Sequence, residues 1–335
     1  MLIKKYYSSL CSDWKSILLL FSGVFIAFYP SLIEDYGYRD DYIAILWHSE
    51  NFDWMRSAYM RDGRPLLAIL VKIFFAPIDS VEDLKFLRMI SVLGGFFLSL
   101  AVFQSLRFWG YSKAIGLLAG LGSATCLALT VYVGWTVCFS YSWASALAVL
   151  SGHCFAKAYF TNCRIFPQVL WAVLLLLIST SIYQAVAPLF FLIPCLAAWQ
   201  VDSSRKKILF SFPASIVAFA AVCVLYLILY KISNALLYEG ASRAAVGIDP
   251  WMKLEHLKTL IERLLQVNLV APARPQSFLM AGTISLATIA NLAASKKRKQ
   301  GVLIPLSILF LLISVGFVPT LASPQYISGF RTDVS

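Results

Sequence analysis

Two short polar motifs lie close together in a chain whose residues are 60% hydrophobic. The first is GYRDDY at 37–42, which contains Asp40 and Asp41, and the second is RDGRP at 61–65. Ten of the 17 acidic residues of the chain fall between positions 34 and 83. Carboxylates gathered beside apolar segments indicate a site that handles protons, a metal ion or a sugar hydroxyl.

The adjacent carboxylates of Asp40 and Asp41 could do acid–base chemistry. A carboxylate accepts a proton from a hydroxyl that lies within hydrogen-bonding reach, and two neighbouring carboxylates repel, which raises the pKa of at least one. If the segment is extended, the two side chains point to opposite sides and only one of them faces a substrate. The ordinary alternative is a pair of solvated loop acids or a helix N-cap.

The RDGRP motif could bind an anion. Gly63 permits a tight backbone turn, and Pro65 is suited to the first turn of a following helix. Arg64 would then lie at the membrane surface, at the positive end of a helix dipole, where a phosphate is readily held. The alternative is a loop turn with an ordinary interfacial arginine. Together the two motifs offer a base and an anion site, a combination suited to a lipid phosphate substrate.

The composition is that of a polytopic helical membrane protein. The chain has 335 residues, 13% charged residues and a mean hydropathy of +0.76, which is too little charge to cover a soluble protein of this size. Basic residues that flank apolar segments contribute to the net charge of +11, so we expect contacts with membrane lipids and no binding of nucleic acid. The seven cysteines show neither a metal-ligand nor a disulfide pattern.

The apolar segments predict about nine membrane spans. Segment 65–78 is short for a span, and segment 168–200 is long for one. All five basic clusters fall on the cytoplasmic side, together with the N-terminus, only if 65–78 does not cross and 168–200 crosses twice, reversing near Tyr183-Gln184. A single tilted helix over 168–200 is the alternative. The remaining apolar segments cover roughly 16–33, 89–106, 114–133, 140–156, 208–230, 277–294 and 301–322.

This topology makes residues 1–335 a single integral-membrane domain with a large external region at 34–88. That region contains both polar motifs, and within it segment 65–78 forms a juxtamembrane helix. We expect Asp40 and Asp41 to be loop residues, so that their replacement leaves folding intact.

A second external region is predicted at 231–276. It contains an amphipathic interfacial helix that begins at Asp249-Pro250. Arg331 follows the last span on the same external side, where it could be a further ligand for phosphate.

The order of these features resembles a known family. One span precedes Asp-Asp-Tyr at 40–42, and Asp-Gly-Arg-Pro at 62–65 leads into an apolar helix. The arrangement is similar to that of the GtrII-type glucosyltransferases of bacteria and their phages, which modify O-antigen. More broadly it resembles the GT-C class of polyprenyl-phosphate-sugar-dependent glycosyltransferases. Tyr183-Gln184 in SIYQA also resembles a family position.

The resemblance implies an all-α transmembrane bundle of GT-C type in the bacterial inner membrane, with an active site that faces the periplasm. The donor would be glucose, or a similar sugar, on undecaprenyl phosphate. The acceptor would be a hydroxyl of lipid-linked O-antigen, which would attack the anomeric carbon of the donor sugar with inversion. A flippase would be a candidate partner.

The resemblance also implies roles for individual residues. Asp40 or Asp41 would be the catalytic base, and Arg64, assisted by Arg61, would hold the donor phosphate. The further substrate-binding positions would be Asp62, Tyr183 and Gln184. Some GT-C enzymes use a divalent metal at such an acidic pair, so Asp40 and Asp41 are also the candidate ligands for Mg²⁺ or Mn²⁺.

Two other classes of membrane protein are consistent with the composition. A transporter or flippase of lipid-linked sugars would place charges at the bilayer midplane and show two related halves, whereas here the acidic residues avoid the spans and no internal repeat is visible. A non-catalytic membrane partner would tolerate replacement of both Asp40 and Asp41.

Overall fold

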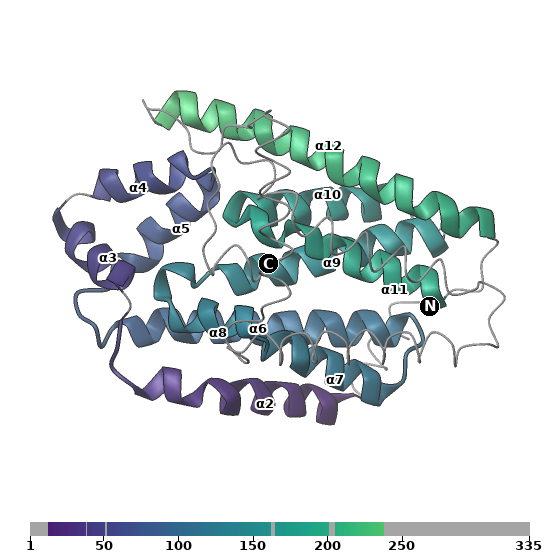
Figure 1. The fold of residues 1–335 in the computed structure, drawn as a ribbon, viewed down its shortest axis with the longest axis horizontal. Coiled ribbons are helices and arrows are strands. Elements are labelled where there is room, and N and C mark those ends of the chain that lie inside the picture. Colours follow the sequence, from purple (N-terminus) through teal and green to yellow (C-terminus); the bar gives the residue numbers. More distant parts are fainter. Residues whose placement is uncertain (1–12, 38, 51, 162–164, 201–204, 238–335) are drawn as a thin grey trace, which may run out of the picture. The chain divides into compact units, whose positions relative to one another are not determined.

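The computed structural model describes residues 13–37, 39–50, 52–161, 165–200 and 205–237, all of which lie in the compact unit Met1–Ser242. Every regular element in these ranges is a helix, and they contain no strand (Figure 1). The elements in chain order are α2 (Trp14–Ile33), α3 (Arg39–Glu50), α4 (Phe52–Arg61), α5 (Pro65–Phe75), α6 (Leu84–Phe108), α7 (Lys113–Ala124), α8 (Leu127–Gly134), η1 (Thr136–Cys138), α9 (Tyr141–Thr161), α10 (Ile165–Ile182), η2 (Gln184–Phe191), α11 (Leu192–Gln200) and α12 (Arg205–Leu237).

Within the described ranges, four helical stretches are long and apolar enough to cross a membrane. They are Trp14–Ile33, Leu84–Phe108, Ile165–Ile182 and Pro213–Leu236. The prediction of an all-α fold with membrane-spanning helices is therefore confirmed for the described ranges, while the count of nine spans stays a prediction. The expected spans at 277–294 and 301–322, the amphipathic helix after Asp249 and the site residue Arg331 lie outside the described residues.

One end of the helical bundle, which we call the basic end, gathers the start of α2, the turn between α6 and α7 and the ends of α9 and α11. Lys113 Nζ lies 3.5 Å from Asp13 Oδ1, and Lys157 Nζ lies 5.4 Å from the centroid of the Phe108 ring. Gln200 Nε2 donates to the Gly110 carbonyl at 3.3 Å. Cations that the topology assigns to the cytoplasmic side thus lie together, although the side that this end faces stays a prediction.

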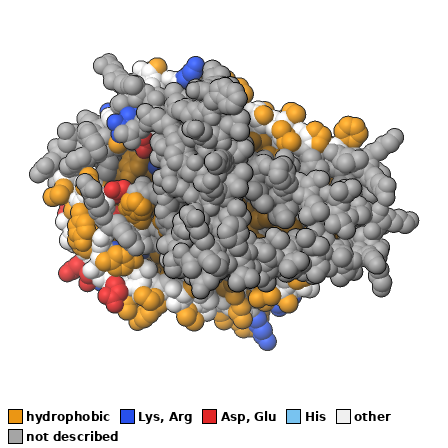
Figure 2. Space-filling view, in the orientation of Figure 1, with side chains coloured by type: hydrophobic (Ala, Val, Ile, Leu, Met, Phe, Trp, Pro, Cys, Tyr) orange, Lys and Arg blue, Asp and Glu red, His pale blue; other side chains and the backbone are white. Residues whose placement is uncertain are grey.

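The opposite end, which we call the acidic end, contains residues 34–84 and the turns at 134–141 and 182–184. It carries α3, α4 and α5, at the left in Figure 1. On the face drawn in Figure 2, the visible acidic side chains lie over this end, among hydrophobic ones. Both polar motifs of the sequence therefore lie at the same end of the bundle.

The apolar segment 168–200 is not one helix. α10 ends at Ile182, Tyr183 is extended with φ −155° and ψ 108°, and the chain continues through η2 into α11. Pro188 lies inside η2, which is a 3₁₀ helix, and it has no N–H to contribute to an α-helical ladder. The chain doubles back because α10 runs toward the acidic end and α11 returns to the basic end, where Gln200 lies. The predicted reversal is therefore confirmed, and the alternative of a single tilted helix is wrong.

The apolar segment 114–133 is also interrupted, which the sequence analysis did not predict. α7 ends at Ala124 and α8 begins at Leu127. The Thr125 hydroxyl donates to the Leu121 carbonyl at 2.9 Å, and Cys126 Sγ donates to the Ser123 carbonyl at 3.3 Å. Side chains that donate to nearby carbonyls in this way compete with the backbone hydrogen bonds of a helix. The glycines that precede the break also have a low helix propensity.

The short apolar segment 65–78 forms α5, with Pro65 in its first turn as predicted. One face of α5 is buried, including Leu67, Val71 and Phe75, and the Phe75 ring lies 6.4 Å from that of Phe139. The helix is therefore packed against the segment between η1 and α9. Its expected place at a membrane surface stays a prediction.

Helix α9 is the centre of the described bundle, because it contacts α6, α10, η2 and α11. Gly94 lets α6 approach α9 closely, since a Cβ atom at Gly94 would lie 2.3 Å from Ser142 Oγ. Trp143 Nε1 donates to the Ile90 carbonyl at 2.8 Å, and Ser142 Oγ donates to the Ser91 carbonyl at 2.9 Å. Small residues and side-chain hydrogen bonds hold these helices together, as is common between apolar helices.

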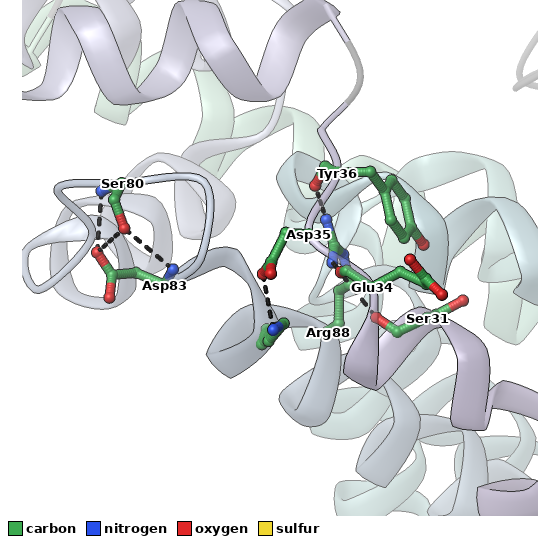
Figure 3. A network of polar contacts seen from close by, with 8 residues as sticks. Ser31, Glu34, Asp35, Tyr36, Ser80, Asp83 and Arg88 are labelled. Carbon is green, nitrogen blue, oxygen red and sulfur yellow. Dashed lines mark hydrogen bonds and ion pairs between the residues drawn. The ribbon is translucent and has the colours of Figure 1, made fainter.

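A fully buried cation ties the start of α6 to the segment that follows α2 (Figure 3). Arg88 Nη1 donates to the carbonyl oxygens of Ser31 at 3.3 Å and Glu34 at 2.8 Å, and Arg88 Nη2 donates to the Tyr36 carbonyl. The guanidinium carbon also lies 3.7 Å from the centroid of the Tyr36 ring. These bonds satisfy carbonyl groups that no helix uses, and they fix the path of the chain into α3.

The loop before α6 is closed by Asp83, whose carboxylate accepts hydrogen bonds from the Ser80 hydroxyl at 2.7 Å and from the Ser80 amide at 2.9 Å (Figure 3). The Asp79 amide donates to the same carboxylate at 3.2 Å. The bond from the Ser80 hydroxyl, followed by the Asp79 amide, lowers the pKa of Asp83. Lys85 Nζ lies 2.7 Å from Asp35 Oδ1 in an exposed ion pair. The long connections at the acidic end are therefore held by local polar contacts.

The close packing of η2 on α9 depends on Gly152 and gives a stability test. A Cβ atom at this position would lie 2.1 Å from the Phe190 carbonyl oxygen, so we expect Gly152→Ala to lower the free energy of unfolding by about 1–3 kcal/mol. The matched control is Gly122→Ala on α7, where a Cβ atom meets nothing within 4 Å and alanine favours the helix by up to ~1 kcal/mol. Thermal unfolding of both variants in detergent would check this, and equal melting temperatures would contradict it.

Candidate functional site

Asp40 and Asp41 lie in the first turn of α3, not in a loop as expected. Carboxylates are favourable at this position because the amino end of a helix is positive. The two side chains lie in different environments, since Asp41 is completely buried while Asp40 is partly exposed. The expectation that both can be replaced without consequence for folding, which rested on a loop, loses its basis for Asp41.

Asp41 joins α3 to the segment in front of α9. Its Oδ1 accepts a hydrogen bond from the backbone amide of Val137, in η1, at 3.1 Å. The two residues are 96 positions apart in the chain. A buried carboxylate that accepts a backbone N–H at the start of a short helix stabilises that turn and is itself stabilised by it.

Arg64 follows a turn that ends α4 with a left-handed glycine. Gly63 has φ +75°, its amide donates to the Met60 carbonyl at 3.0 Å, and the Arg64 amide donates to the Tyr59 carbonyl at 2.9 Å. This is the Schellman pattern of a helix C-terminus, which needs glycine at the left-handed position. The tight turn expected at Gly63, and the helix expected from Pro65, are both confirmed.

The carbonyl side of the same turn is bound by two distant side chains. Gln184 Nε2 donates to the Gly63 carbonyl and lies 3.4 Å from the Asp62 carbonyl oxygen. The Tyr226 hydroxyl, from α12, also donates to the Gly63 carbonyl, and Gln184 Nε2 lies 2.7 Å from Tyr226 Oη. Residues of η2 and α12 therefore converge on the turn that precedes Arg64.

The guanidinium of Arg64 is held against stacked tyrosines. Arg64 Nη1 donates to Tyr141 Oη at 2.7 Å, and the guanidinium carbon lies 5.7 Å from the centroid of the Tyr141 ring and 5.0 Å from that of Tyr183. The two rings stack with centroids 3.9 Å apart at an interplanar angle of 5°, and the Tyr132 ring meets both edge-on. These contacts orient the cation without neutralising it, because an aromatic face or a tyrosine hydroxyl contacts a cation without carrying a negative charge.

Two arginines of the second motif keep hydrogen-bonding capacity. The Nε atoms of Arg61 and Arg64 are buried, and neither has a hydrogen-bond partner among the described residues. Both side chains as a whole are partly exposed. A guanidinium in this state can still donate in a fork to an oxyanion such as phosphate.

The two motifs meet on one short stretch of chain, which we call the anchor segment, residues 136–141. Asp41 is bound to Val137 of this segment, and Arg64 is bound to Tyr141, four positions later. One carboxylate of the acidic pair and the Arg64 cation, which come from different motifs, are therefore bonded to the same short segment. This arrangement can supply a proton acceptor and an anion ligand to the same substrate.

The other expected site residues are placed as follows. Tyr183 is 2% exposed and faces Tyr141, and Gln184 is bonded to backbone, so both contact the Arg64 turn in this structure. The Asp62 side chain is partly exposed.

A metal site at the acidic pair is not supported by a ligand cluster. In the described ranges, no group of three or more His, Cys, Asp or Glu side chains is arranged to hold a metal ion. One oxygen of Asp41 already accepts the Val137 amide. Because Mg²⁺ is often held by only one or two carboxylates together with water and substrate phosphate, a metal at Asp40 and Asp41 stays a prediction.

Tyr141 and Tyr226 were missed by the sequence analysis. They lie 77 and 163 positions from the residues that they contact, so no local spacing indicates them. The sequence contained one signal for them, a tyrosine within an apolar segment. A buried tyrosine hydroxyl usually needs a hydrogen-bond partner.

Comparison with known proteins gives one match. A family model described as glucosyl transferase GtrII matches residues 29–332, which is most of the chain and includes both motifs. No curated protein and no solved structure matches the chain.

The burial of Asp41 gives a second stability test. We expect Asp41→Ala to lower the free energy of unfolding by about 1–3 kcal/mol, because the buried Val137 amide loses its acceptor. Asp41→Asn keeps an oxygen that can accept this bond, and should lose less. The control is Asp40→Asn, which changes the partly exposed neighbour. Thermal unfolding in detergent measures all three, and an Asp41→Ala variant as stable as Asp40→Asn would show that the contact with η1 contributes little.

Proposed function

The chain belongs to the glucosyl transferase GtrII family, which makes it a glycosyltransferase, and from this premise we propose a specific reaction. The enzyme transfers glucose, or a similar sugar, from undecaprenyl phosphate to a hydroxyl of lipid-linked O-antigen. The transfer takes place at the periplasmic face of the bacterial inner membrane, and it inverts the anomeric carbon.

The observation that carries the proposal is the anchor segment, to which both motifs are bonded through Val137 and Tyr141. Transfer from a sugar phosphate to a hydroxyl needs a proton acceptor for the hydroxyl and a cation for the departing phosphate. The two requirements are met here by Asp40 with Asp41, and by Arg64 with Arg61.

The proposed reaction is a single displacement. The acceptor hydroxyl gives its proton to a carboxylate, and its oxygen attacks the anomeric carbon from the face opposite the phosphate. The bond between that carbon and the phosphate oxygen breaks, and its electron pair leaves with the phosphate. Because phosphate is a good leaving group, the reaction does not need the second, protonated carboxyl group that glycoside hydrolysis uses.

Between the two aspartates, Asp40 is the better candidate for the base. It is partly exposed, whereas Asp41 is completely buried and already accepts the Val137 amide. In this assignment Asp41 holds the start of α3 in place, and Asp40 meets the acceptor.

Arg64 is the better candidate for the phosphate ligand. Its guanidinium is oriented by Tyr141, and its Nε is buried without a partner among the described residues. As the bond to phosphate breaks, negative charge grows on the leaving group, and a preorganised guanidinium stabilises that charge. Arg61 supplies a second cation from the end of α4.

The direction of the site follows from the charge distribution. Basic residues flanking spans are retained on the cytoplasmic side, so the basic end faces the cytoplasm and the acidic end faces the periplasm. A polyprenyl-linked donor made in the cytoplasm must then be moved across the membrane, which requires a flippase as partner.

The base assignment predicts a large loss of activity for Asp40→Asn. We expect sugar transfer to fall by about 10²-fold or more, the usual scale for loss of a general base, while the melting temperature stays near that of the unchanged protein. The measurement is the O-antigen composition of cells that carry the chain or the variant. A new side-branch sugar that disappears in Asp40→Asn supports the assignment.

The control for that experiment is the Asp40→Asn, Asp41→Asn double variant, with its presence in the membrane verified. If the double variant still adds the sugar at the full rate, the acidic pair is not the base. If the unchanged chain adds no sugar, the glycosyl transfer to O-antigen is itself wrong and a transport or partner role gains support.

The phosphate assignment predicts that Arg64→Lys weakens use of the donor although the charge is retained. The lysine ammonium cannot donate as a planar fork, so we expect kcat/KM for the polyprenyl-phosphate sugar to fall about tenfold or more. Steady-state kinetics on the purified enzyme, with donor concentration varied, measures this. A variant with unchanged kinetics would remove Arg64 from the donor site.

A further inference from the structure

The peptide group between Gly63 and Arg64 is fixed on both of its sides. Its N–H, from Arg64, donates to the Tyr59 carbonyl at 2.9 Å. Its C=O, from Gly63, accepts from both Gln184 and Tyr226, a pair that we call the Gly63 clamp. Because a peptide group is planar, holding both sides fixes the plane from which the Arg64 side chain departs.

The members of the Gly63 clamp also support one another. Gln184 Nε2 lies 2.7 Å from Tyr226 Oη and can donate to it, while the Tyr226 hydroxyl donates onward to Gly63. Tyr226 is 6% exposed and Gly63 is buried, so water is a poor substitute for either donor. Connected hydrogen bonds in such an environment strengthen each other, and an unmet carbonyl there is costly.

The clamp acts where the backbone is least constrained by its own sequence. Gly63 has φ +75° and no side chain, so within the turn only the bond from the Arg64 amide to the Tyr59 carbonyl restrains its ψ angle, and the clamp adds a restraint from outside. A rotation there would move the Arg64 guanidinium away from Tyr141 Oη, its partner at 2.7 Å. η2 and α12 therefore determine the direction of a cation that belongs to neither of them.

We propose that Gln184 and Tyr226 are positioning residues that aim Arg64 at the donor phosphate by holding the Gly63–Arg64 peptide plane. The part that concerns phosphate rests on the proposed function, whereas the part that concerns the backbone does not. Gln184, which the sequence suggests as a substrate ligand, acts in this assignment through the backbone of the turn. Tyr226 gives α12 a role in a site whose charged residues lie on α3, α4 and the turn after it.

The backbone part is tested by hydrogen–deuterium exchange on the full chain in detergent. The variants are Tyr226→Phe, which removes only the hydroxyl, and Gln184→Met, which keeps the length of the side chain and removes the amide. We expect amide exchange in peptides that cover residues 60–68 to quicken about fivefold, the scale of one ordinary neutral hydrogen bond. Exchange in peptides from α6 should not change.

The matched control is Tyr111→Phe. The Tyr111 hydroxyl also donates to a backbone carbonyl, that of Leu196, at 3.0 Å, but at the basic end. Its loss should leave exchange at 60–68 unchanged. If Tyr226→Phe and Gln184→Met give the same exchange as Tyr111→Phe in these peptides, the clamp does not hold the turn and the proposal is overturned.

The functional part is tested by combining variants. Tyr226→Phe alone should lower kcat/KM for the polyprenyl-phosphate sugar about fivefold, as should Gln184→Met. If the clamp acts through Arg64, adding either change to Arg64→Lys should lower kcat/KM by much less than a further fivefold. The reason is that the effects of residues that work through one group are not additive. Tyr111→Phe should leave kcat/KM near its original value.

The outcomes separate the two proposals. Quickened exchange with full additivity would mean that the clamp holds the turn but does not act through Arg64, which overturns the positioning role alone. Unchanged kinetics in Arg64→Lys itself would overturn the phosphate assignment, and the exchange result would then stand without it. A change in preference between two sugars on the same polyprenyl phosphate, in Gln184→Met only, would show that Gln184 touches the sugar and would contradict the proposal.

Discussion

The acidic end depends on one constraint, the attachment of both polar motifs to residues 136–141. Asp41 reaches this segment through the Val137 amide and Arg64 reaches it through the Tyr141 hydroxyl. The segment is itself short and irregular, and it is held because η1 leads directly into α9, which packs against α6, α10, η2 and α11. A short polar turn at the start of α9 can therefore fix the positions of Asp41 and Arg64 relative to each other. The local sequence around either residue does not determine those positions.

Tyrosine is suited to this task in an apolar bundle. Its ring packs like any large hydrophobic side chain, and its hydroxyl provides a single directional hydrogen bond. Tyr141 uses the ring to stack on Tyr183 and the hydroxyl to orient Arg64. Tyr226 likewise stacks on Tyr230 and donates to Gly63. Polar groups needed at the site are thus carried by side chains whose burial also stabilises the helices.

The buried Arg88 has a different part in the same design. A charge with no exposed surface is costly unless its donors are used, and here both Nη atoms donate to backbone carbonyls at the end of α2 and in the segment before α3. Those carbonyls belong to the segment that leads into Asp40 and Asp41. Arg88 of α6 therefore fixes the path of the chain before Asp40 and Asp41. η1 fixes the position of Asp41 itself.

Several features were determined by the sequence alone. Composition and apolar segments indicated an all-helical membrane protein, and the charge pattern indicated the reversal at Tyr183 because a single crossing would separate the basic clusters. Gly63 and Pro65 determined the turn and the start of α5, since a left-handed position needs glycine and a first turn suits proline. The two motifs and their order were enough to indicate the family.

Only the tertiary structure decided which aspartate is buried, which groups orient Arg64 and where the helix over 114–133 is interrupted. The sequence analysis placed Asp40 and Asp41 in a loop because they lie in the external region that follows the first apolar segment, but the amino end of a helix also accepts adjacent carboxylates. The partners of Asp41, Arg64 and Gly63 come from segments 77 to 163 positions away. Hydrogen bonds over such separations depend on helix packing, which local patterns of residue type do not specify.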